Sequence, residues 1–105
     1  MMTTRLESAA RVIFSPPEAA TAVAWLDQHC NADRLHATPD MVERIAAAAL
    51  KKSEGTLEKL AAATELAARD WRDLLMAAGF GYDVSAHEAW FRQLARQESK
   101  PTNHP

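Results

Sequence analysis

The chain of 105 residues contains one cysteine, Cys30, so it cannot form an intrachain disulfide. A low cysteine content is typical of proteins from a reducing compartment. Residues 1–14 do not contain the continuous apolar core of a signal peptide, because Glu7 interrupts them. No apolar run approaches the roughly 20 residues that cross a membrane. We therefore expect a cytoplasmic protein without membrane contact.

Isoleucine, valine and glycine are also scarce, whereas alanine is abundant. Because β-branched residues favour strands and alanine has the highest helix propensity, this composition predicts an all-α protein. We expect one helical domain over residues 1–97 and a disordered tail over residues 98–105, which contain two prolines and no apolar residue. The alanine and arginine content also suggests a GC-rich bacterial genome.

A field of positive charge is absent, because 14 acidic residues outnumber 12 basic ones and the two signs are interspersed. Proteins that bind nucleic acid non-specifically need such a field to meet the phosphate backbone. The composition therefore disfavours nucleic acid as a partner.

Recognisable metal and catalytic patterns are also missing. Cys30, His29, His36 and His87 have none of the spacings that hold structural zinc. Cys30 is predicted on an apolar stripe near a helix C-terminus, where the helix dipole raises the pKa of a thiol instead of activating it. We expect no metal, no cofactor and no enzymatic activity.

Helix start and stop signals divide the chain into about five helices. Caps of the Ser-Pro and Thr-Pro type begin two of them, S/T-x-x-E patterns mark helix starts, and glycine follows two predicted helix ends. Because the helices differ in length, we expect a small irregular or orthogonal bundle. The predicted helices cover residues 4–14, 16–30, 39–52, 57–78 and 86–97, with a loop at 31–37.

The segment 57–78 leaves two possibilities open. Its apolar residues follow one helical face except Leu66, which points almost opposite Leu57 on a continuous helix. Either Leu66 meets a second neighbour, or the helix breaks between Leu66 and Asp70, with Asp70 capping a second helix.

The same segment also allows a helix-turn-helix interpretation, in which Thr64–Leu66 form the turn and Arg69 and Arg72 contact DNA. The turn position usually held by glycine is Glu65 in this chain. Two aspartates lie beside the arginines and cancel their charge. We keep DNA binding as the alternative function.

The function that we prefer is based on an apolar face that is wider than contact with one neighbouring helix requires. The face that includes Met41, Ile45 and Leu50 is wide, and Trp25 lies away from the apolar stripe of its helix. Trp25 either makes an internal contact, which we favour, or serves as an exposed anchor. We expect a non-enzymatic protein-interaction or regulatory module that binds another protein or itself as a homodimer.

Overall fold

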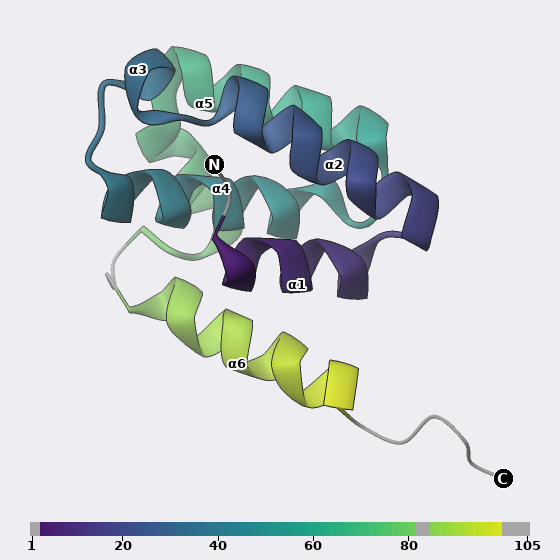
Figure 1. Cartoon of the computed structure of the whole chain (residues 1–105). Coiled ribbons are helices and arrows are strands. Elements are labelled where there is room, and N and C mark those ends of the chain that lie inside the picture. Colours follow the sequence, from purple (N-terminus) through teal and green to yellow (C-terminus); the bar gives the residue numbers. More distant parts are fainter. Residues whose placement is uncertain (1–2, 82–84, 100–105) are drawn as a thin grey trace, which may run out of the picture.

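Six helices form the described part of the chain, residues 3–81 and 85–99 of the computed structural model (Figure 1). The predicted all-α bundle is confirmed. Within those residues, no helix is both long and apolar enough to cross a membrane. The helices are α1 (Thr4–Ile13), α2 (Pro16–His29), α3 (Ala32–Leu35), α4 (Pro39–Ser53), α5 (Leu57–Ala78) and α6 (Ala86–Ser99).

Side-chain caps begin most of these helices, as the sequence indicates. Thr38 and Thr56 accept hydrogen bonds from backbone N–H groups in the first turns of α4 and α5. The first helix is capped by Thr3, whose hydroxyl accepts a hydrogen bond from the backbone N–H of Leu6. A short helix, α3, occupies the segment predicted as a loop, and Asn31 caps it.

Helix α4 lies at the centre of the bundle and packs against α1, α3, α5 and α6. All six residues from Ile45 to Leu50 have no exposed surface, so α4 is buried on every side over this stretch. The prediction that Ile45 and Leu50 meet an external partner is therefore wrong. Their wide apolar face is explained by several neighbouring helices inside the domain.

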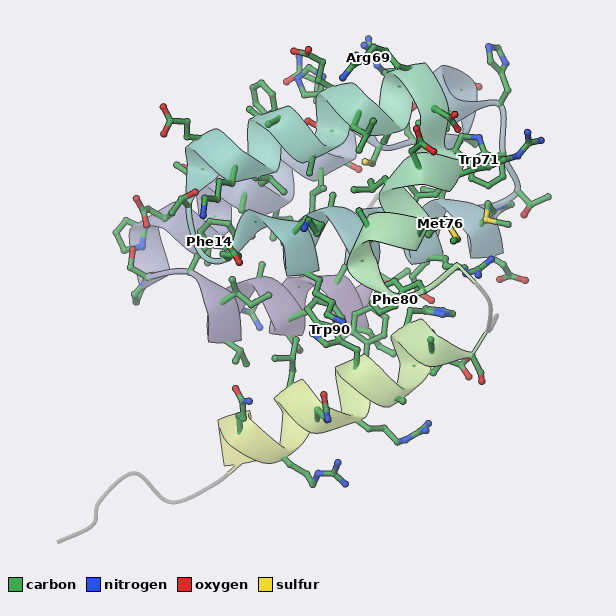
Figure 2. The ribbon with its side chains drawn as sticks, turned by 180° about the vertical axis from the view of Figure 1, so that it is seen from behind. Phe14, Arg69, Trp71, Met76, Phe80 and Trp90 are labelled. Atoms are coloured by element: carbon green, nitrogen blue, oxygen red, sulfur yellow. The ribbon has the colours of Figure 1, made fainter. Side chains whose placement is uncertain are left out.

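Helix α5 breaks at Asp70, whose backbone leaves the helical conformation at φ −161° and ψ 89°. The Asp70 carboxylate accepts a hydrogen bond from the backbone N–H of Arg72 at 3.1 Å, as an N-cap does. Of the two possibilities that the sequence leaves open, the structure shows the break capped by Asp70, and Leu66 also packs against the core. The two parts of α5 run in different directions (Figure 2). The turn expected at Thr64–Leu66 is wrong, because these residues are helical.

The end of α5 connects to α6 through a tightly packed corner. Gly79 adopts a left-handed conformation at φ 84°, and the backbone N–H of Phe80 donates to Leu75 O at 2.8 Å. The buried Phe80 ring lies 6.0 Å from the ring of Trp90 on α6 (Figure 2). Of the predicted tail, residues 98 and 99 are helical, and 100–105 lie outside the described residues, as do 82–84 of the predicted turn.

Replacing Asp70 by alanine should destabilise the domain by about 1 kcal/mol, because the first turn of the second part of α5 loses its side-chain acceptor. Urea unfolding followed by circular dichroism measures this change. The matched control is Glu65→Ala, an exposed acid within the first part of α5, which should stay within about 0.5 kcal/mol of the wild type. Equal effects of the two substitutions would show that Asp70 does not act as a cap.

Candidate functional site

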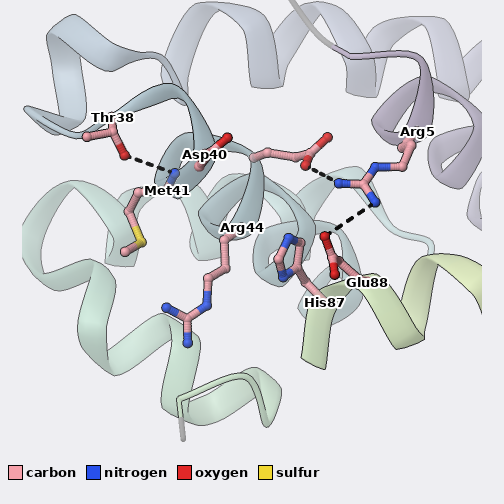
Figure 3. A pocket seen from close by; sticks show the side chains of 8 residues that line it. Arg5, Thr38, Asp40, Met41, Arg44, His87 and Glu88 are labelled. Carbon is pink, nitrogen blue, oxygen red and sulfur yellow. Dashed lines mark hydrogen bonds and ion pairs between the residues drawn. The ribbon is translucent and has the colours of Figure 1, made fainter. Parts of the chain in front are cut away.

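A polar cavity of about 350 Å³ lies where α1, α4 and the start of α6 meet (Figure 3). It brings together residues that are far apart in the sequence. Two cations and three carboxylates face it, together with one imidazole. Its walls are formed by Arg5, Asp40, Glu43, Arg44, His87 and Glu88, with Thr38 and Met41 at the edge.

Arg44 is the most unusual of these residues, because it is a cation with only 8% of its surface exposed. It directly precedes the buried run of α4, which fixes its position. Its Nη2 donates a hydrogen bond to the carbonyl oxygen of Phe80. Its Nε has no partner and is shielded from solvent. Among residues 3–81 and 85–99, no carboxylate forms an ion pair with this guanidinium.

His87 lies in the first turn of α6 and is 7% exposed. Its ring packs against the rings of Phe80 and Phe91, with centroid distances of 6.4 and 6.0 Å. Its Nδ1 has no hydrogen-bond partner. Burial lowers the pKa of His87 and outweighs the opposing effect of Glu88 and Glu43, while Arg5 lowers it further. The folded protein thus favours the neutral imidazole.

The acids of the cavity are held by other groups. Glu43 accepts hydrogen bonds from Arg5 and from the Thr3 hydroxyl, the latter at 2.8 Å. Burial opposes ionisation of Glu43, but the hydrogen bonds from Arg5 and Thr3 outweigh it and keep its pKa below the usual value. Arg5 also lies 3.9 Å from Glu88 (Figure 3). Glu43, Glu88 and Arg5 therefore form one ion-pair network beside the unpaired Arg44.

The interaction residues predicted from sequence lie in different places. Met41 lines the cavity, whereas Ile45 and Leu50 belong to the core. Trp25 makes the internal contact that we favoured, since its Nε1 donates to the Thr64 hydroxyl at 2.8 Å. Its ring also stacks on His29, with a centroid distance of 4.0 Å.

Arg69 and Arg72 do not line this cavity; both are exposed and lie beside the break in α5. Figure 2 shows Arg69 there. Arg69 and Arg72 line a second polar pocket, of about 410 Å³, with Arg34, His36 and Asp70. The Arg72 guanidinium lies 5.4 Å from the centre of the Trp71 ring.

Cys30 is completely buried, as expected for a small core residue. Burial raises the pKa of its thiol to about 12, against a smaller opposing effect of Arg34. No group of three or more histidine, cysteine, aspartate or glutamate side chains in the described ranges is arranged to hold a metal ion.

Comparison with known proteins found no match to any family model, curated protein or solved structure. The geometry of the cavity is therefore the basis of the functional proposal. The sequence does not identify Arg44 as a site residue, and it gives His87 no role beyond a missing zinc spacing. The available signal was the position of Arg44 directly before an apolar run.

Folding lowers the pKa of His87 from its ordinary value of 6.5. Near and below pH 6.5, His87 therefore binds more protons in the unfolded chain than in the folded protein. The contribution of His87 to the free energy of unfolding is therefore complete above pH 6.5 and is lost as the pH falls below it. Replacing His87 by leucine should stabilise the protein more at about pH 5.5 than at about pH 7.5, as urea unfolding measures. The control His36→Gln, at an exposed position, should keep the wild-type pH dependence. An unchanged slope in the leucine variant would contradict the assignment.

Cys30 should not react with a thiol reagent in the folded protein, because its thiol is inaccessible and protonated at neutral pH. Mass spectrometry after treatment with iodoacetamide should detect no label in buffer and a single label in concentrated urea. Complete labelling of the folded protein within minutes would show that Cys30 is accessible.

Proposed function

We propose that this chain is a non-enzymatic protein-interaction module that binds a short segment of another protein between α1 and α6. The surface that supports this proposal is an apolar groove of about 260 Å³, which we call the α1–α6 groove. It is lined by Thr4, Ser8, Phe91, Arg92, Leu94 and Ala95, together with Arg5 and Glu88.

The composition of the groove suits a peptide. Phe91 and Leu94 form an apolar floor, and both are nearly buried, so their positions are fixed by the core. Arg92, Arg5 and Glu88 provide charged groups around it. An apolar centre with a polar rim is the usual anatomy of a protein interface.

The observation that supports the proposal is that this groove borders the polar cavity. Arg5 and Glu88 line both. A bound segment can therefore place apolar side chains over Phe91 and Leu94 and a polar group near Arg44. The combination of an apolar surface and a few placed polar groups gives both affinity and orientation.

The two other functions are less well supported. Self-association has no exposed apolar face on α4 to support it, since Ile45 and Leu50 are buried. DNA binding lacks the expected turn at Thr64–Leu66. The groove therefore favours a segment of a different protein.

Peptides selected on the immobilised protein from a random display library should bind in the α1–α6 groove. Replacing Ser8 by arginine fills the groove with a long charged side chain and should weaken binding of those peptides at least tenfold, or by about 1.4 kcal/mol. The matched control is Ala20→Arg, which adds the same side chain at an exposed position of α2 outside the groove. Fluorescence anisotropy with labelled synthetic peptides measures all three affinities.

Circular dichroism establishes that both variants are folded before binding is compared. Peptides that bind the wild type and the Ser8 variant equally well would overturn the proposal. Light scattering of the wild type tests self-association separately, and a concentration-dependent dimer abolished by the Ser8 substitution would replace the foreign segment with a second copy of this chain.

A further inference from the structure

The buried guanidinium of Arg44 is the starting point, because it has one neutral acceptor and no counterion among the described residues. A buried charge without a counterion is costly, so such groups are normally paired. The nearby His87 also has an unpartnered ring nitrogen. Two side chains that are each more than nine-tenths buried thus line the same cavity, and each has a polar atom without a hydrogen-bond partner.

The three carboxylates of the cavity do not balance Arg44. Glu43 is bonded to Arg5 and Thr3. Asp40 and Glu88 each lie in the first turn of a helix, where the helix dipole favours a negative charge. Among the residues that the structure describes, Arg44 is the cation of the cavity without an ion-pair partner.

We propose that the cavity is a binding site for a single carboxylate group, which accepts hydrogen bonds from Arg44 and contacts His87. A guanidinium is planar and matches the two oxygens of a carboxylate. One negative charge balances the guanidinium of Arg44, which has no counterion in the described part of the chain. A phosphate dianion would add a second negative charge beside Asp40, Glu43 and Glu88, and like charges at this range repel.

The inner wall of the cavity is buried, whereas Arg5 and Glu88 at its other side are partly exposed. Arg44 Nε and His87 Nδ1 are both shielded from solvent, so a small side-chain rotation has to accompany entry of a carboxylate oxygen. A hydrogen bond to either of these two buried atoms is stronger than one at an exposed surface, because water competes less for it. The inference deepens the proposed function, since a bound peptide segment can carry the carboxylate, but small acids test it independently.

The direct test is NMR spectroscopy of the full-length protein labelled with ¹⁵N, following the Nε–H signal of Arg44 and the ring signals of His87. Acetate, N-acetyl-leucine and an N-acetyl-glutamate α-amide present a free acid, a chain end and an acidic side chain. These acids should shift both sets of signals, and N-acetyl-leucinamide should not. The acid that binds most tightly identifies the natural source of the carboxylate as a free acid, a chain end or an acidic side chain.

Two variants connect the binding to the named residues. Arg44→Met should weaken binding of the best acid by about tenfold to hundredfold, as expected for a charge-assisted hydrogen bond. Arg11→Met, at an exposed arginine of α1 outside the cavity, should bind like the wild type. Because Arg44 also holds the Phe80 carbonyl, His87→Leu serves as a second variant if Arg44→Met does not fold, and it should weaken binding several-fold.

The proposal is overturned if the amide shifts the Arg44 signal as strongly as the acid does, or if inorganic phosphate binds more tightly than every carboxylate. It is also overturned if a folded Arg44→Met or the His87→Leu variant binds the acid with wild-type affinity. Small acids that bind when no peptide does would leave the site intact and remove the proposed function. Peptides that bind the groove equally well without any carboxylate would support the proposed function and overturn the carboxylate site.

Discussion

The packing of α4 is the constraint on which the rest of the structure depends. From Ile45 to Leu50 every residue is buried, and four of the six are alanines. Methyl side chains let α5 and α1 approach α4 closely, and they leave no room for larger groups without strain. The apolar area comes mainly from large residues around the helix, such as Leu26, Leu60 and Phe80. Arg44 directly precedes this buried run, so the packing of α4 in the core fixes the position of Arg44 and of the cavity that it lines.

Much of the fold was predictable because its signals are local. Caps such as Thr38 and the glycine at 79 act within one helix turn, and Asp70 is a residue type that caps a helix. The neighbours of a helix are not a local property. The wide face around Ile45 and Leu50 was interpreted as a surface for a partner, but periodicity does not tell how many helices of the same domain cover a face.

The cavity was beyond prediction for a related reason. Arg44 and His87 are separated by most of α4, all of α5 and the corner at Phe80, and no motif joins them. Each residue has an ordinary sequence context, on the edge of an apolar run and in the first turn of a helix. What distinguishes Arg44 and His87 is that both are buried and that each has a nitrogen without a hydrogen-bond partner. Both properties arise from the packing of α6 against α1 and α4. Ion pairs such as Arg5 with Glu43 likewise arise from tertiary contact.

The break at Asp70 has a consequence for local unfolding. A continuous helix of 22 residues tends to open as one cooperative unit, but α5 consists of two segments with different anchors. The first is tied to α2 by the bond between Trp25 and Thr64. The second is tied to α4 by Lys51, which donates a hydrogen bond to the carbonyl of Ala78. Arg44 donates another to the carbonyl of Phe80, two residues after the end of α5. Amide hydrogens in the second segment can therefore be protected by whatever occupies the cavity, while exchange in the first segment stays the same.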